Sequence, residues 1–304
     1  MDRLSAMALL VKVTELGSMS AAARALNMPL TTVSRHIGEL ESALGVRLLA
    51  RTTRKLTLTD AGVDYVAAAR RILEEVENAE RQATGEYQEP KGELVLSAPT
   101  MFGRQHVLPV VTDFLARYPQ IRVRLLLSDR NADLVGDQID LAVRIGTLPD
   151  SGMVATRLGE MRIVTCAHPA LLEKHGIPER PRELAALPII RIESPMPYRG
   201  WRFNAEEAED RLVALQPVLS LTTPESAADA ARLGAGVARL LHYQAIDGLA
   251  RGELKLLLQA MEPEPAPVHL LYTSRDLAPL KLRKFIDFAA PALRQALLRI
   301  AAAV

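Results

Sequence analysis

The sequence is poor in features that define several other classes of protein. Cys166 is the single cysteine among 304 residues, so no disulfide can form within the chain, which is typical of a reducing compartment. No apolar run approaches the roughly 20 residues that cross a membrane. Lys12 and Glu15 interrupt the apolar positions at the N-terminus, unlike the apolar region of a signal peptide. We therefore expect a soluble, cytoplasmic protein that does not enter membranes.

The motifs of common enzyme classes are missing as well. There is no G-x-S-x-G elbow, no P-loop and no G-x-G-x-x-G; Gly234-Ala235-Gly236 lacks the third glycine. The six histidines are scattered, and none pairs with Cys166 or another histidine at a metal-ligand spacing. Cys166 lies in an apolar segment, which favours a buried inert thiol over a redox sensor. We expect no catalytic residues, no metal and no cofactor.

The near-neutral net charge of +1 hides a local excess of basic residues. Residues 24–58 hold six basic and two acidic side chains, a local charge of 6 − 2 = +4, and glutamates dominate the residues that follow. A basic patch on a near-neutral chain indicates a nucleic-acid-binding segment joined to a part that does not bind nucleic acid.

The N-terminal pattern predicts three helices and a hairpin. The apolar positions Leu4, Met7, Ala8 and Val11 indicate one face of a first helix, and Ser20 is a candidate N-cap of a second helix over 21–26. A third helix is predicted over 30–44, with Gly45 ending it and with a buried face made of Val33, Ile37, Leu40 and Leu44. Short strands in 46–58 around the polar tip 51–55 predict a wing.

A long helix is predicted to begin at Thr59-Asp60. Its narrow apolar seam, which includes Val66, Ile72, Leu73 and Val76, runs along an otherwise charged helix. Such a seam is typical of a two-stranded coiled coil that forms a dimer, and the alternative is a helix that packs on its own domain.

From residue 92 onward, after a linker at 85–92, the pattern alternates between strands and helices. Strands are predicted at 94–96, 123–127, 139–145, 162–167, 189–192, 218–221, 237–241, 254–258 and 268–272. Helices are predicted at 108–118, 170–175, 225–233 and from about 280. This alternation predicts mostly parallel sheets covered by helices, and the length favours two lobes. The fold class is therefore α/β and multidomain.

Residues 18–62 carry a long run of motifs: Ala-Ala-Ala-Arg-Ala-Leu-Asn, Val-Ser-Arg-x-Ile, Leu-Glu-x-x-Leu-Gly-Val-Arg-Leu, Arg-Thr-Thr-Arg and Leu-Thr-x-Ala-Gly. This run resembles the signature of LysR-type transcriptional regulators, and the likeness continues at 140–159 and 275–288. The resemblance implies a winged helix-turn-helix (1–58), a dimerising linker helix and hinge (59–91) and a periplasmic-binding-protein-like effector domain (92–304). Within that domain it implies lobe one at 92–162 plus 268–304 and lobe two at 163–267.

The resemblance also implies which residues face DNA. In the helices these are Ser20, Thr31, Thr32, Ser34 and Arg35, and in the wing Arg51, Thr53, Arg54 and Lys55. For Arg35 the alternative is a surface ion pair, and for the wing residues a solvated hairpin tip. The family often has Ser-Gln-Pro where this chain has Pro29-Leu30-Thr31. Leu30 therefore replaces a base-reading glutamine, and it either touches a thymine methyl or packs on the second helix.

The effector is expected between the lobes, at the carboxyl ends of strands. The candidate effector-binding residues are Ser97, Thr100, Met101, Phe102, Ser128 and Arg144 from lobe one, and Arg191, Glu193 and Thr223 from lobe two. Backbone N–H groups near Thr100 could hold an anion at a helix start, and Arg144 could pair with a carboxylate. The alternative for Arg144 is a structural salt bridge with Asp140 or Asp129, and for Trp201 core packing is favoured over ligand stacking.

Taken together, the sequence predicts a DNA-binding regulator rather than an enzyme or a free-standing solute-binding protein. Its partners are expected to be double-stranded DNA, a small-molecule effector such as an organic anion, and further copies of itself in a homodimer or homotetramer. RNA polymerase is a candidate further partner. The residues do not identify the effector, the target promoters or the sign of regulation.

Overall fold

The computed structural model describes residues 2–51, 56–83, 89–130, 134, 136–148, 153–193, 200–272 and 278–303. The chain divides into two compact units, Met1–Gln88, which we call the head, and Glu89–Val304, the C-terminal unit. Within the described ranges no single helix is long and apolar enough to cross a membrane; α1 and α2 meet these criteria only as a pair, across a bend of 116°.

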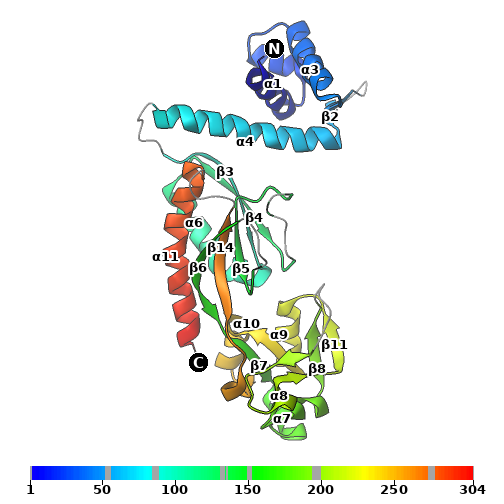
Figure 1. Cartoon of the computed structure of the whole chain (residues 1–304), viewed down its shortest axis with the longest axis vertical. Coiled ribbons are helices and arrows are strands. Elements are labelled where there is room, and N and C mark those ends of the chain that lie inside the picture. The colour runs from blue at the N-terminus through cyan, green and yellow to red at the C-terminus, as the bar shows by residue number, and fades with distance from the viewer. Residues whose placement is uncertain are drawn as a thin grey trace. The chain divides into compact units, whose positions relative to one another are not determined.

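The head combines helices with a small hairpin (Figure 1). α1 (Arg3–Leu16), α2 (Met19–Ala25) and α3 (Leu30–Leu44) are followed by the antiparallel strands β1 (Leu49–Arg51) and β2 (Leu56–Leu58). The core of the head is formed by apolar side chains from all of these helices and from the base of the hairpin, among them Leu10, Val13, Ala22, Val33, Ile37, Leu40, Leu48 and Leu49. The predicted third helix and both strands of the wing are confirmed.

Two local predictions in the head are wrong. Of the predicted face of α1, Met7 is buried and Val11 is half-buried, but Leu4 and Ala8 are exposed; the other buried residues are Ala6, Leu9, Leu10 and Val13. Both sets fit a helical period, but α2, α3 and α4 all pack against α1, so the larger apolar face is covered. Ser18, not Ser20, caps α2: its hydroxyl accepts the N–H of Ala21 at 3.3 Å because the helix begins earlier, at Met19.

Helix α4 (Asp60–Ala83) belongs to the head and begins at the predicted cap. The Thr59 hydroxyl accepts the N–H of Gly62 at 3.0 Å. Val66 and Ala69 are buried, and Val66 joins the core of the head, so the first half of α4 packs on its own domain. Ile72, farther along the predicted seam, is exposed. The alternative of packing on its own domain thus holds for the first half, and dimerisation through the remainder stays a prediction.

Lobe one of the C-terminal unit is built on a five-stranded sheet of order β4-β3-β5-β14-β6. Its strands are β3 (Gly92–Ala98), β4 (Ile121–Leu127), β5 (Leu141–Ile145), β6 (Val154–Met161) and β14 (Ala266–Tyr272). Its helices are α5 (Thr100–Phe102), a π-helical turn (Gly103–Val107), α6 (Leu108–Arg117) and the long α11 (Leu280–Ala302). Figure 1 shows α11 alongside this sheet, and its apolar face, with Phe285, Ala289 and Leu293, joins the largest core cluster.

Lobe two has a second five-stranded sheet, of order β11-β8-β12-β7-β13. Its strands are β7 (Ile163–Ala167), β8 (Ile189–Ile192), β11 (Pro217–Leu221), β12 (Val237–Leu241) and β13 (Lys255–Leu257). The main helices are α7 (Pro169–His175), α9 (Pro224–Arg232) and α10 (His242–Ala250), with 3-10 turns at Pro181–Ala186 and Gln259–Met261. Smaller elements are the pair β9 (Trp201–Arg202) and β10 (Leu212–Val213) and the short α8 (Ala208–Arg211).

The prediction of mostly parallel sheets is wrong, because half of the ladders in each five-stranded sheet are antiparallel. The strands β7 and β14 run against their neighbours on both sides. Each is the first strand that the chain forms after it crosses from the other lobe, so each enters its sheet in the opposite direction. The sequence pattern also missed β6, which directly precedes the first crossing, and α10 of lobe two.

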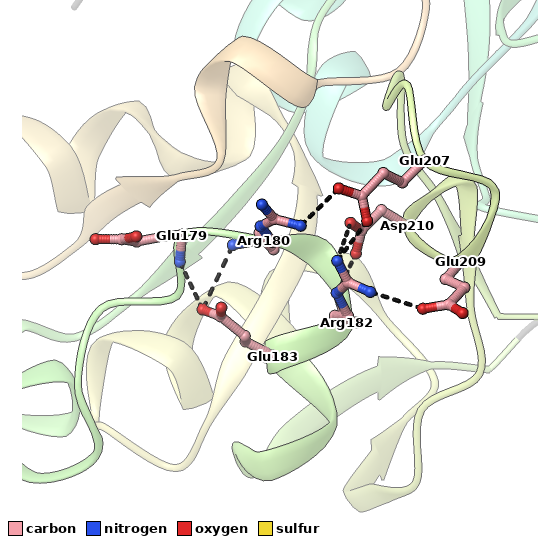
Figure 2. A network of polar contacts seen from close by, with 7 residues as sticks. All are labelled: Glu179, Arg180, Arg182, Glu183, Glu207, Glu209 and Asp210. Atoms are coloured by element: carbon pink, nitrogen blue, oxygen red, sulfur yellow. Dashed lines mark hydrogen bonds and ion pairs between the residues drawn. The ribbon is translucent and has the colours of Figure 1, made fainter.

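An ion-pair network holds the smaller elements of lobe two together (Figure 2). The Arg182 guanidinium contacts Glu207, Glu209 and Asp210, and Arg180 pairs with Glu207 at 2.6 Å. Asp210 is buried and accepts the backbone N–H of Arg182 at 2.9 Å. The network thus joins the 3-10 turn at Pro181–Ala186 to α8, and each of its exposed ion pairs contributes little to stability because solvent screens the charges.

Candidate nucleic-acid interface and effector site

Helix α3 turns a polar face away from the core of the head. Val33, Ile37 and Leu40 form its buried stripe. On the remaining arc, Thr31 and Arg35 are exposed and Thr32 and Ser34 are half-buried. The structure therefore brings these four candidate residues together on the surface of one helix.

A tight turn holds α2 against the start of α3. Asn27 adopts the left-handed region with φ of 51°, and Met28 donates its N–H to the carbonyl of Ala23 at 2.9 Å. Ser20, half-buried on α2, borders a shallow depression that also includes Leu30. The candidate Ser20 thus lies near the first residue of α3.

Leu30 and Arg35 are both exposed to solvent, to different degrees. Leu30 is 46% exposed and borders the same depression as Ser20 and Ala23 of α2, so α2 covers it only in part. The Arg35 guanidinium, 67% exposed, has its Nε 4.0 Å from Oε1 of Glu39 one helical turn further on. An exposed pair of this spacing in a helix is worth about 0.3–0.5 kcal/mol, so it leaves the guanidinium available to another partner.

The base of the wing is fixed to α3 by a carboxylate that the sequence analysis did not single out. Oε1 of Glu41 accepts the N–H groups of Leu48 and Leu49 at 2.8 and 3.0 Å. At Gly62 a Cβ atom would lie 2.0 Å from the carbonyl oxygen of Leu48, so only glycine permits this close approach of α4 to the hairpin. Thr53, Arg54 and Lys55 lie outside the described residues, as does the side chain of Arg51.

In lobe one, three candidates lie at the carboxyl ends of neighbouring parallel strands. Ser97 of β3 is in register with Ala142 of β5, two residues before Arg144, and Ser128 follows β4. Ser97 is 1% exposed, and its hydroxyl has no hydrogen-bond partner among the described residues. Arg144 is half-buried, and burial lowers the pKa of its guanidinium. The sheet thus collects a serine hydroxyl and a partly desolvated guanidinium at one edge.

Two expectations for this edge need correction. Phe102 is fully buried in the core of lobe one, where its ring packs against His106 and Tyr243, so it is a core residue rather than a ligand contact. The N–H of Thr100 donates to Oδ1 of Asp129 at 3.0 Å, so a carboxylate of the chain itself already occupies this helix start. Met101 is half-buried against the same core.

The lobe-two candidates also lie where parallel strands end. Arg191 of β8 is in register with Ser220 of β11, and the N–H of Glu193 donates to the carbonyl of Leu221 at 2.7 Å. Thr223 caps α9, since its hydroxyl accepts the N–H of Ser226 at 3.2 Å. Arg191 is half-buried, whereas the side chains of Glu193 and Thr223 are exposed.

Direct contacts bring these two edges together. Arg104, which follows Phe102 closely, pairs with Glu225 of α9 at 2.6 Å. The Tyr243 ring of α10 packs edge-on against Phe102 of lobe one, with ring centroids 5.4 Å apart, and burial raises the pKa of its phenol to about 12. These contacts join residues more than a hundred positions apart in the chain, so no local sequence pattern could have indicated them.

The crossing between the lobes carries its own ion pair. Arg162, between β6 and β7, donates from Nε and Nη2 to the two carboxylate oxygens of Glu262 at 2.9 and 2.8 Å. Glu262 lies on the returning segment between β13 and β14, and this hydrogen-bonded pair raises the pKa of Arg162. The pair therefore fastens the outgoing and returning crossings to each other.

The remaining candidates are structural. Trp201 is buried in the core of lobe two, and the Arg239 guanidinium lies 5.0 Å from its ring centroid, which confirms core packing. Cys166 is fully buried, and burial raises the pKa of its thiol to about 12, which disfavours the reactive thiolate. Among the described residues no three histidine, cysteine or carboxylate side chains gather as metal ligands would.

A helix-turn-helix with a hairpin wing, joined to a two-lobed α/β unit, defines a DNA-binding regulator with a ligand-sensing domain. Residues 4–63 match the family model of the bacterial regulatory helix-turn-helix protein, lysR family, and residues 87–294 match that of the LysR substrate binding domain. The chain belongs to the LysR family of transcriptional regulators.

Individual relatives agree with this assignment. The transcriptional activator AaeR of Escherichia coli is 33% identical over 94% of this chain and 93% of its own length. The structure of CrgA from Neisseria meningitidis, a LysR-type regulator, is 32% identical and covers 95% of this chain and 98% of that one, with a TM-score of 0.61. AphB, a virulence activator of Vibrio cholerae, is 27% identical over 95% and 99% of the two chains, with a TM-score of 0.60. AaeR is named as a transcriptional activator, CrgA as a LysR-type transcriptional regulator and AphB as a virulence activator.

Proposed function

We propose that the chain binds specific double-stranded DNA through α3. Thr31, Thr32, Ser34 and Arg35 are the base-facing residues, and the observation that supports this is their common position on the solvent side of a helix whose opposite side is buried. A helix of this kind fits the major groove, where an arginine can bind guanine with two hydrogen bonds.

Phosphate contacts come from the residues that flank this helix. Ser20 on α2 and Arg51, Thr53, Arg54 and Lys55 of the wing are the proposed contacts. Phosphate contacts set the position and orientation of a protein on DNA without reading its sequence, and they make binding depend on salt.

The effector is proposed to bind between the lobes, at the two strand edges that Arg104 and Glu225 bring together. Ser97, Ser128 and Arg144 are its contacts from lobe one, and Arg191, Glu193 and Thr223 from lobe two; Thr100 and Met101 border the same edge. Arg144 favours an organic anion, since a guanidinium pairs with a carboxylate through two hydrogen bonds. Because Asp129 holds the N–H of Thr100, an anion at that position must first displace it.

Assembly is proposed to proceed through α4 to a homodimer and through the C-terminal units to a homotetramer. Two heads would then read half-sites whose centres lie about 34 Å or a multiple apart. The effector changes DNA binding only if it binds two assemblies with different affinity. RNA polymerase is a further proposed partner, the protein acts in the cytoplasm with the chromosome, and no enzymatic step is required.

The direct test is fluorescence anisotropy with the DNA upstream of the coding region, against scrambled DNA, over a series of salt concentrations. We expect preference for the upstream DNA, and an affinity that falls linearly on logarithmic axes with a slope of about −0.9 for each phosphate contacted. Sequence-independent binding to all genomic fragments, with or without added effector, would contradict the proposal.

A further inference from the structure

Leu30 is an apolar side chain held open to solvent at the first position of α3. It is 46% exposed, while Val33 and Ile37, the next apolar residues of the helix, are fully buried. Single exposed leucines are common on protein surfaces, so exposure by itself assigns no role. The position of Leu30 among the residues proposed to face DNA is the feature that distinguishes it.

Leu30 lies one helical turn before Ser34, so these two side chains are neighbours on the helix surface. The N-terminal residues of a recognition helix are those that contact base edges in the major groove. A leucine offers neither donor nor acceptor there. The thymine C5 methyl is the apolar group that base pairs present in the major groove.

We infer that Leu30 reads a thymine, through contact between its side chain and the C5 methyl of one thymine in each half-site. The inference rests on the proposed function of α3. A G·C pair at this position would place the polar edge of guanine or cytosine against the leucine and leave it without a partner, which is unfavourable. An A·T pair in the right orientation instead buries a methyl group against an apolar side chain.

Replacing thymine by uracil in DNA tests this contact, because it removes the methyl group and preserves the base pair. The full-length protein is first used to select binding sites from a random duplex library, and each thymine of the selected site is then replaced in turn. Burial of one methyl-sized group is worth about fourfold in affinity. We therefore expect one thymine in each half-site whose replacement weakens binding about fourfold, and about fifteenfold when both are replaced.

Two variants separate the contact from an effect of uracil on DNA shape. Leu30→Ala should bind the thymine and uracil sites with nearly equal affinity, since it has no side chain to meet the methyl. Leu26→Ala is the matched control: Leu26 is also an exposed leucine, but it follows the end of α2 rather than beginning α3, and this variant should keep the full difference. Both variants should keep the wild-type affinity for non-specific DNA, which shows that the head remains folded.

The outcomes distinguish this inference from the proposed function. If no sequence is enriched in the selection, both are overturned. If a site is selected but no uracil replacement weakens binding, or if Leu30→Ala shows the same uracil effect as the wild type, the role of Leu30 is overturned and the DNA-binding function stands.

Discussion

The head and the C-terminal unit present their candidate residues in different states. In the head, Thr31 and Arg35 project from α3 into solvent, and Nε of Arg35 lies 4.0 Å from Oε1 of Glu39. In the C-terminal unit, two candidate residues already have partners within the chain: the Thr100 N–H donates to Asp129, and the Thr223 hydroxyl accepts the N–H of Ser226.

This difference indicates two ways of binding. A ligand of the head meets groups that are already in place, so contact with DNA needs little rearrangement of α3. In the proposed effector site, a ligand at Thr100 or Thr223 would have to displace a partner that lies within the same lobe. A surface of the first kind suits recognition, and one of the second kind suits a switch between two states.

The largest expected effect is on DNA recognition. Arg35→Ala should weaken specific binding by about 1–3 kcal/mol for each half-site, because a lost pair of hydrogen bonds to a base has that cost. Thermal stability should not change, since the side chain is exposed. Fluorescence anisotropy with specific and non-specific DNA measures the loss of affinity. Calorimetry measures the thermal stability. Glu39→Ala is the control, because it removes the ion-pair partner and leaves the arginine; equal losses on both DNAs would refute base reading by Arg35.

The next effect is on the stability of the C-terminal unit. Arg162→Met removes both hydrogen bonds to Glu262, whose side chain is only 14% exposed, and leaves that carboxylate without its partner. We expect a loss of about 1.5–3 kcal/mol in the free energy of unfolding, measured by urea denaturation. The double variant Arg162→Met/Glu262→Gln should recover part of it. A single variant as stable as the wild type would mean that the pair does not fasten the crossings.

The elements that the sequence predicted correctly are those fixed by local signals. Helix α3 was predicted to its bounds because its core pattern and its terminal Gly45 are local signals, and Gly45 adopts the expected positive φ of 71°. The buried face of α1 was predicted only in part, with Met7 correct and Leu4 and Ala8 wrong, because two apolar stripes fit the period and only packing chooses between them. The assignments of α3 and of the wing strands therefore needed no knowledge of distant contacts.

The inter-lobe site could be predicted only in part. The ends of β4 and β8 were placed from local pattern, and so were Ser128 and Arg191, whereas β3 was predicted to end at residue 96 and runs to Ala98, so Ser97 lies within it. That Phe102 is a core residue, and that Asp129 holds the N–H of Thr100, depend on contacts between distant segments. The directions of β7 and β14 could not be predicted for the same reason. These strands run antiparallel to their neighbours because the chain passes between the lobes, and a local sequence pattern does not indicate that path.

A smaller effect is expected from the ion pair between the lobes. Arg104 and Glu225 are both exposed, so Arg104→Ala or Glu225→Gln should lower the free energy of unfolding by about 0.2–1 kcal/mol. The pair restrains the two lobes, and its loss should broaden the distance distribution between spin labels at Arg122→Cys and Leu233→Cys, one on each lobe. Cys166 is buried and stays unlabelled. An unchanged distribution in both variants would show that other contacts alone hold the lobes.

The smallest effect concerns pH and again separates the two units. The His106 imidazole is half-buried beside the rings of Phe102 and Tyr243, and burial, followed by the positive charge of Arg299, lowers its pKa below the ordinary 6.5. On acidification the unfolded chain takes up this proton first, near pH 6.5, whereas the folded unit takes it up only at lower pH. The contribution to stability is therefore present above pH 6.5 and is lost as the pH falls from there to the folded pKa.

His106→Phe should flatten this dependence, measured as the urea midpoint of the C-terminal unit between neutral pH and about pH 5. Some slope should remain, because burial also lowers the pKa of His269 on β14. The control is His36→Phe, a substitution in α3 of the head, and both variants are measured in the full chain. If His36→Phe flattens the profile as much as His106→Phe does, the acid sensitivity does not arise from the buried contact between the lobes.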